Sequence, residues 1–152
     1  MIKDIFDSAV TAELIDRINS LTANSTPQWG KMTVDQMLAH CNVAYAYTFN
    51  PEKFKKPNFV KRWLLKTFAK PMVVGPQPYK KGSPTAPIFL ITDRKNFEKE
   101  KSELIDNIHK TQQLGRTYFE GKENISFGKL TANEWNTLFY KHLDHHLNQF
   151  GV

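Results

Sequence analysis

Two capping boxes constrain the fold of this chain more than any other feature of its sequence. Thr33 is followed three residues later by Gln36, and Thr131 is followed in the same way by Glu134. In this pattern each of the two side chains binds a backbone amide of the other residue, which starts a helix. No Pro or Gly interrupts the stretch from Thr33 to Phe49, or the stretch from Thr131 almost to the end of the chain. The sequence therefore predicts two long helices over these stretches.

Two further long helices are predicted from apolar residues that recur every three or four positions. The first is expected to begin with Ser8 as its N-cap and to run to about Leu21. The second is expected to begin with Thr92 as its N-cap and to run to about Leu114, where Gly115 ends it. The predicted buried faces consist of Val10, Leu14, Ile15, Ile18 and Leu21, and of Phe97, Leu104, Ile105 and Ile108.

The long connection between the second and third of these helices has a different composition. It is predicted to contain a short basic amphipathic helix over residues 59–70, which Pro71 ends. The apolar residues on or near one side of this helix are Phe59, Trp63, Leu64 and Phe68. Between Pro71 and Pro87 the density of prolines and glycines is too high for regular structure. We therefore expect a long crossover loop there.

These elements together predict an all-α fold in a single domain over residues 1–152. A chain of this length can bury one sufficient hydrophobic core, and its sequence shows no internal repeat and no convincing strand. Four long helices and one short extra helix favour a four-helix bundle. The long connection permits a crossover in place of simple up-down order.

Three of the five histidines lie on the last predicted helix, and helical angles separate them. At about 100° per residue, His142 and His146 fall within about 20° of Trp135 on the apolar face. His145 lies at the border with polar residues. Side chains at i and i+4 project one turn apart from the same face, so two imidazoles can reach one metal ion.

His40 is the natural third ligand of this predicted metal site. It shares a helix face with Met37, Ala44 and Tyr47, and metal sites in helical bundles take ligands from facing helices. Three neutral imidazoles leave at least one coordination position open, as in catalytic sites, whereas structural zinc sites are closed by four protein ligands. The alternative is that the inward histidines are hydrogen-bonded residues of the core.

Charge and cysteine content bear on partners and compartment. Residues 52–81 hold nine Lys or Arg against one acid, Glu52, in a chain of net charge +6. Such a stretch attracts anionic ligands, membranes or nucleic acid, or it is simply a solvated face. We expect no nucleic-acid or membrane partner, and we expect the stretch to border the mouth of the metal cavity and to favour anionic ligands.

The compartment is expected to be the cytoplasm. No segment approaches the roughly 18 consecutive apolar residues that span a bilayer, and the N-terminus lacks the plan of a signal peptide. The one cysteine, Cys41, is predicted to be a buried structural thiol, which fits a reducing compartment. His109, one residue past the apolar Ile108, is predicted to be exposed.

Several stretches carry a resemblance to a known family. They are residues 29–32 and 36–40, residues 127–131 and 134–135, and residues 141–151. On these residues the chain resembles the DinB/YfiT-like superfamily. Within it, the chain is similar to a branch of small bacterial proteins that is known only as a domain of unknown function and is expected to bind metal. The resemblance covers essentially the whole chain.

This resemblance implies an up-down-down-up four-helix bundle that holds a divalent metal ion, commonly nickel, zinc or iron. His40, His142 and His146 match the family's ligand positions, which are one histidine on the second helix and an HxxxH pair on the last. Better characterised relatives are thiol-dependent transferases and isomerases that act with low-molecular-weight thiols such as bacillithiol or mycothiol.

The chain departs from the family pattern at two places. Asn124 and Ile125 stand where relatives often have His-Pro, so any role of that histidine is absent here. Asn148 stands where an arginine is expected, which puts in doubt a contact from that position to an anionic ligand.

The expected function is that of a metal-dependent enzyme, in which the ion binds and deprotonates a small thiol that then attacks an electrophilic substrate. A metal-dependent hydrolase would use the same open position, and a non-enzymatic metal-binding or structural bundle is the alternative from another class. No acid or base is placed in the cavity, because Glu134, Asp144 and Asp35 are predicted to project away from the histidines. The sequence specifies neither the catalytic groups nor the oligomeric state, and a homodimer is one state that it allows.

Overall fold

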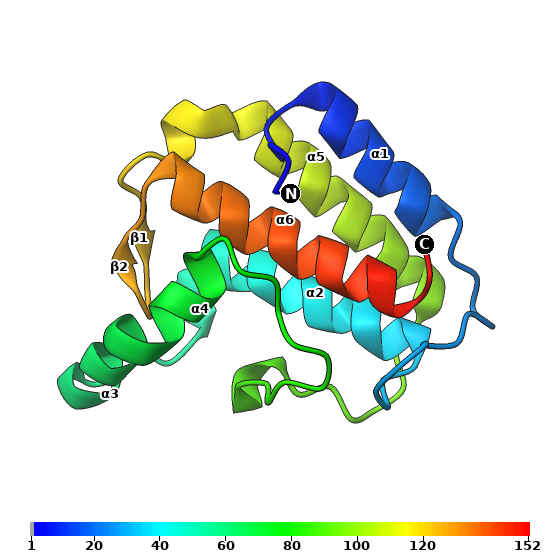
Figure 1. Ribbon diagram of the computed structural model, residues 1–152, viewed down its shortest axis with the longest axis horizontal. Helices are drawn as coiled ribbons and strands as arrows, with labels where there is room; N and C mark the ends of the chain where they lie inside the picture. Colours follow the sequence, from blue (N-terminus) through cyan, green and yellow to red (C-terminus); the bar gives the residue numbers. More distant parts are fainter. Residues whose placement is uncertain (1) are drawn as a thin grey trace.

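Four long helices form the body of the molecule in the computed structural model, which describes residues 2–152. They are α1 (Ser8–Asn19), α2 (Val34–Phe49), α5 (Phe97–Phe119) and α6 (Ala132–Gln149). In Figure 1, α1 and α6 run in one direction and α2 and α5 run in the other. Contacts join α5 to each of the other three, and α6 to α1 and α2. The predicted all-α class is confirmed.

The core lies between these helices and is built largely from aromatic rings. Tyr45 stacks on Phe139 with ring centroids 4.9 Å apart. Trp135 also stacks on Phe139, with ring centroids 5.5 Å apart. Cys41 is buried in this core as predicted, and burial raises the pKa of its thiol. His109 is exposed, also as predicted.

Both predicted capping boxes are present and begin α2 and α6. The amide of Thr33 donates to Oε1 of Gln36, 3.0 Å away, and the amide of Thr131 donates to Oε2 of Glu134, 2.9 Å away. These bonds satisfy amides that the first turn of a helix leaves without partners. The starts of α2 and α6 are therefore fixed by local sequence.

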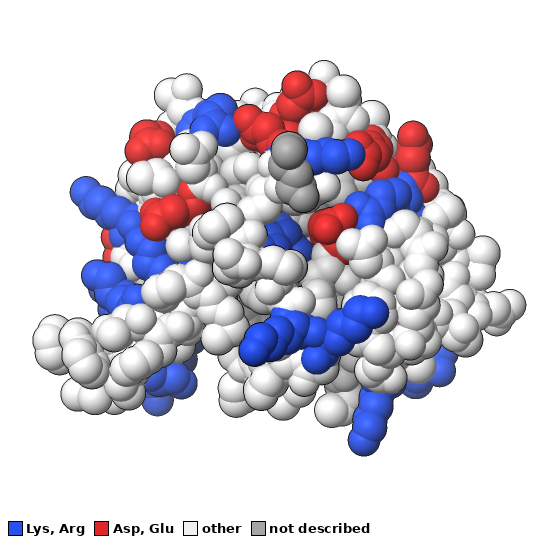
Figure 2. Space-filling view, in the orientation of Figure 1, with Lys and Arg blue, Asp and Glu red and all other residues white. Residues whose placement is uncertain are grey.

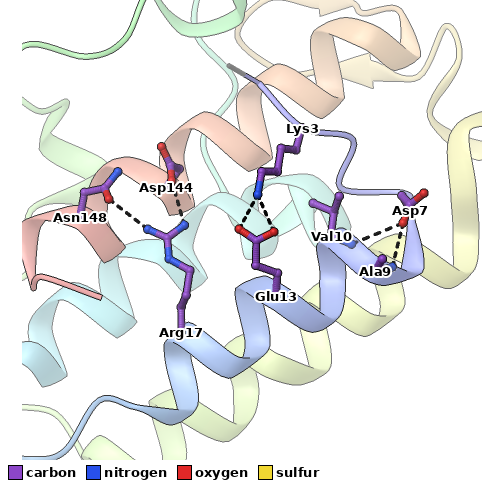
Figure 3. A network of polar contacts seen from close by, with 8 residues as sticks. All are labelled: Lys3, Asp7, Ala9, Val10, Glu13, Arg17, Asp144 and Asn148. Carbon is purple, nitrogen blue, oxygen red and sulfur yellow. Dashed lines mark hydrogen bonds and ion pairs between the residues drawn. The ribbon is translucent and has the colours of Figure 1, made fainter.

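The N-caps predicted for the other two long helices are wrong. Asp7, not Ser8, caps α1, because its Oδ1 accepts from the amides of Ala9 and Val10 (Figure 3). Asn96, not Thr92, caps α5 through the amide of Lys99. Asp and Asn are as favourable at the N-cap position as Ser or Thr, so residue type alone does not decide which of several neighbouring residues caps a helix.

Gly115 ends the long regular part of α5, as predicted, and a short second helical stretch follows it across a kink. Its φ of 67° and ψ of 177° lie outside the helical region, and the helix continues beyond it to Phe119. A positive φ is a conformation that glycine adopts without the steric cost of a side chain. α1 ends at Asn19, two residues before its predicted end at about Leu21.

The crossover between α2 and α5 contains more helix than predicted. It holds η1 (Pro51–Lys53), α3 (Phe59–Leu64), the π-helical turn η2 (Leu65–Ala69), α4 (Lys70–Val74) and η3 (Pro87–Phe89). α3, η2 and α4 form one continuous helical segment. Pro71 was expected to end it, but Pro71 lies directly after the π-helical turn, in the first turn of α4, and the helical segment continues to Val74.

The predicted apolar stripe of this segment does not pack on the core. Phe59 is 85% exposed, Trp63 56% and Phe68 66%. The side chains that pack against the core are instead Leu65, Ala69 and Val73, spaced four residues apart. The π-helical turn carries an extra residue, so the face of the helix upstream of it does not continue downstream.

A small hairpin, β1 (Glu123–Asn124) paired antiparallel with β2 (Gly128–Lys129), is the one departure from the all-helical prediction among the described residues. Oδ1 of Asn124 accepts from the amides of Ser126 and Phe127 and so builds the turn. Within residues 2–152, no helix has the length and apolar composition needed to cross a bilayer.

Candidate metal centre

Three histidines from two helices converge beside the core. His40 comes from the middle of α2, and His142 and His146 come from adjacent turns of α6. One ring nitrogen from each lies within 4.8 Å of the others, and the Nε2 atoms of His40 and His142 are 2.9 Å apart. The structure thus brings together the three residues that the sequence predicted as ligands.

A backbone carbonyl fixes the tautomer of His40. Nδ1 of His40 lies 2.8 Å from the carbonyl oxygen of Phe89 in η3. A carbonyl only accepts, so Nδ1 carries the proton and donates, and Nε2 presents a lone pair. The crossover therefore orients a side chain of α2 toward α6.

A glutamine fixes His146 in the same way. Nε2 of Gln149 donates to the carbonyl of Trp29, 2.7 Å away, so its Oε1 is the atom that faces His146. Nδ1 of His146 donates to this Oε1 over 2.8 Å, which leaves Nε2 of His146 with a lone pair. Metal-bound histidines commonly donate their second N–H to such a partner, which holds the ring in place.

Gly30 explains why the loop before α2 can approach Gln149 so closely. Its φ is 84°, and a Cβ at this position would lie 2.7 Å from Nε2 of Gln149. A side chain there would therefore displace Gln149 from the carbonyl of Trp29. The Trp29-Gly30 pair thus supports His146 at one remove.

The histidines are held uncharged. Burial lowers the pKa of His40, and burial together with the neighbouring imidazoles holds the pKa of His142 well below its usual value. Burial, with His40 next to it, lowers the pKa of His146 to about 3. Neutral imidazoles keep the lone pairs that ligate a metal ion.

The donor set fits a divalent transition metal ion. The lone pair of His40 Nε2 faces Nε2 of His142 over 2.9 Å, a contact that is favourable when His142 donates a proton or when a cation lies between the two nitrogens. Imidazole suits zinc, iron and nickel, and three such ligands leave coordination positions for water or substrate. The group contains no carboxylate or thiolate from the described part of the chain.

The carboxylates that could have served as ligands point elsewhere, as predicted. Asp35 is buried but accepts from the amide of Lys95. Glu134 pairs with Lys70 over 2.8 Å. Asp144 pairs with Arg17 of α1, which also donates to Asn148 (Figure 3), so an arginine does stand beside position 148, but it comes from another helix.

His145 was predicted at the edge of the apolar face, and it forms part of the wall of a cavity. Its ring meets those of Trp29 and Tyr79 edge-on, at centroid distances of 5.9 and 5.5 Å. The cavity has a volume of about 920 Å³ and is also lined by all three histidines of the cluster. Tyr47 and Ser126, joined by a 2.7 Å hydrogen bond, line it as well.

Lys141 is a structural residue that the sequence did not reveal. Its side chain is almost fully buried, and Nζ donates to the carbonyls of Met72, Gly75 and Gln77 at 2.8, 2.6 and 3.1 Å. Burial lowers the pKa of this lysine to about 8. Its position one residue before His142 means that the same turn of α6 carries a ligand candidate and anchors the crossover.

Comparison with known proteins assigns the chain to a family whose function is described as unknown. A family model described as "Protein of unknown function (DUF1569)" matches residues 6–151. No curated protein and no solved structure matches the chain.

Proposed function

The chain belongs to the protein family of unknown function DUF1569, and we propose from the site that it is a metal-dependent enzyme in which His40, His142 and His146 hold one divalent ion. The observation that carries this proposal is the convergence of the three imidazoles, two of which have their Nδ1 protons committed to Phe89 and Gln149. Zinc, nickel and iron are the ions that suit this donor set.

The reaction class that we propose is transfer to or from a low-molecular-weight thiol. A bound divalent cation lowers the pKa of a coordinated thiol or water by several units. The chain itself contributes a largely apolar cavity wall, and the Tyr47–Ser126 hydroxyl pair on that wall can donate to a polar group of the electrophilic substrate. Lys141 holds the crossover against α6 and so keeps the cavity wall in place.

The helix order supports relating the bundle to the DinB/YfiT-like superfamily. α1 and α6 run antiparallel to α2 and α5 in Figure 1, which is an up-down-down-up order. We propose on this basis, and on the positions of the three histidines, that the chain shares the superfamily's bundle and metal position. The thiol-transfer proposal rests on this relation.

The test begins with metal analysis of protein purified without a histidine tag. We expect about one equivalent of a divalent metal, lost in His142→Ala and kept in the matched variant His145→Ala. Turnover is then measured with a panel of electrophiles, with and without added thiols. Turnover that needs a thiol supports the proposal, and turnover without one replaces it with a metal-dependent hydrolase. Wild-type protein that holds no metal under any loading condition means a structural bundle.

A further inference from the structure

The cavity beside the three histidines is larger than a thiol and a small electrophile need. Its volume of about 920 Å³ lies at the upper end of the range for drug-sized ligands. Along α2 it is lined by His40, Ala44 and Thr48 at four-residue spacing, which spans about 12 Å at 1.5 Å per residue. The chamber therefore extends along α2 from His40 toward the end of that helix, and it also extends past the histidines to Trp29 and Gln149.

Most of the chamber wall is hydrocarbon. The crossover supplies Leu65, Ala69 and Val73 from its helical segment, and the apolar stretch of residues 86–91 around η3. The bundle supplies Ala44 of α2 and Leu138 of α6. Such a wall favours a ligand with an apolar body, because each buried methylene contributes about 0.8 kcal/mol of burial free energy.

The charged side chains on this wall are of one sign. Lys55 and Lys61 line the chamber, and no Asp or Glu does so among the residues that the structure describes. Both lysines belong to the part of the crossover that follows α2, and Figure 1 places α3 near the end of the bundle where α2 finishes. In Figure 2 the acidic side chains gather on the upper part of this face, while the lower part, over the crossover, is basic or uncharged.

From the large apolar chamber and its two lysines we infer that the site takes an anionic amphiphile, a molecule with a hydrocarbon body and a carboxylate or similar negative group. The body lies along α2 and against the crossover, and the negative group pairs with Lys55 and Lys61. This inference deepens the proposed function, since it names the substrate class of the same site, and it rests on that function only for the reacting end at the histidines.

Binding of simple carboxylates tests the inference without any assay of turnover. Titration calorimetry of metal-free and zinc-loaded protein with acetate, hexanoate, octanoate and decanoate should show affinity rising about fourfold per added methylene. Octanoate should bind about fivefold more tightly than octanol, since a charge paired with a lysine adds on the order of that factor. Octylammonium should bind more weakly than octanol.

Matched variants separate the body of the ligand from its charge. Ala69→Trp fills the chamber and should abolish the dependence on chain length, whereas Val60→Trp, on the outward side of the same segment, should not. Lys55→Glu combined with Lys61→Glu should remove the preference for octanoate over octanol, whereas Lys53→Glu, at a residue that does not line the chamber, should leave it. Circular dichroism checks that each variant is folded, and the lysine variants keep the test decisive if Ala69→Trp is not.

The outcomes also separate this inference from the metal proposal. Acetate that binds as tightly as octanoate, and only to zinc-loaded protein, means that the carboxylate binds the metal ion, which overturns the amphiphile and leaves the metal site standing. A chain-length dependence in a protein that never holds metal overturns the metal proposal alone. Equal binding of octanoate, octanol and octylammonium shows that the lysines select nothing, and the inference then fails.

Discussion

Replacing Gln149 with methionine isolates the contribution of a residue that bonds a candidate ligand and whose Oε1 and Nε2 both have partners within the protein. Gln149→Met keeps the length of the side chain but removes both of its bonds, to Nδ1 of His146 and to the carbonyl of Trp29. Loss of such an orienting partner typically costs 10- to 100-fold in metal affinity, which is about 1.4–2.7 kcal/mol. Competition against a chromogenic chelator, with zinc as the probe, measures this change directly.

Two further variants make the result interpretable. Asn148→Ala alters the exposed neighbour, whose side chain bonds Arg17 instead, and should leave zinc affinity unchanged. Gly30→Ala places a Cβ 2.7 Å from Nε2 of Gln149, so it should lower affinity through the same contact. Combined with Gln149→Met it should add little further loss of affinity, because the two changes act on one interaction. Gln149→Met protein that binds zinc within about twofold of wild type would refute the idea that Gln149 orients His146.

Three other outcomes are expected from the structure. Chelation should leave the far-ultraviolet circular dichroism of the protein nearly unchanged, because the core of four helices supplies most of the burial; loss of most helical signal would instead indicate a structural metal site. Lys141→Met should unpin the crossover and speed proteolysis between residues 70 and 80 relative to an exposed control, Lys110→Met, and equal cleavage rates would contradict this. Burial raises the pKa of Asp35, but the hydrogen bond from the Lys95 amide and the other hydrogen bonds to the carboxylate together lower it by more, so the pKa of Asp35 is below its usual value. Asp35→Asn should then lower the free energy of unfolding by about 1–2 kcal/mol at pH 7. This difference between the variant and the wild type should shrink as the pH falls below the usual pKa of Asp, about 3.9. A difference that persists undiminished at pH 2 would mean that the ionised form of Asp35 is not what stabilises the fold.

The parts of the structure that local sequence decides were the parts that could be predicted. A capping box is completed within four residues, so α2 and α6 begin at Thr33 and Thr131 as expected. The phase of a long regular helix follows from its own geometry, so the angle between His142 and His146 needed no knowledge of the rest of the chain. Only the pairing with His40 required a statement about which helices face each other.

The contacts that orient the histidines could not be predicted, because they come from loops. The acceptor for His40 is the backbone carbonyl of Phe89, and every residue has a carbonyl, so no residue type marks it. The carbonyl of Trp29, which orients Gln149, cannot be recognised from the sequence either, for the same reason. What the sequence does carry is indirect: Gly30 stands where a side chain would meet Gln149, and this reason appears only once the loop is placed.

The crossover shows why an apolar stripe in a sequence does not identify the buried face of a helix. Phe59, Trp63 and Phe68 are the larger residues and dominate any hydrophobic pattern, yet Leu65, Ala69 and Val73 are the ones that pack on the core. Lys141 of α6 holds this segment in place, because its Nζ donates to the carbonyl of Met72 in the last turn of α4 and to the carbonyl of Gly75 just after that turn. The π-helical turn shifts the face of the segment, and the anchor holds its last turn on α6, so that Leu65, Ala69 and Val73 are the side chains against the core. Leu65, Ala69 and Val73 also line the chamber, so one wall of the proposed substrate site lies on a segment that is anchored by a buried lysine one residue before His142.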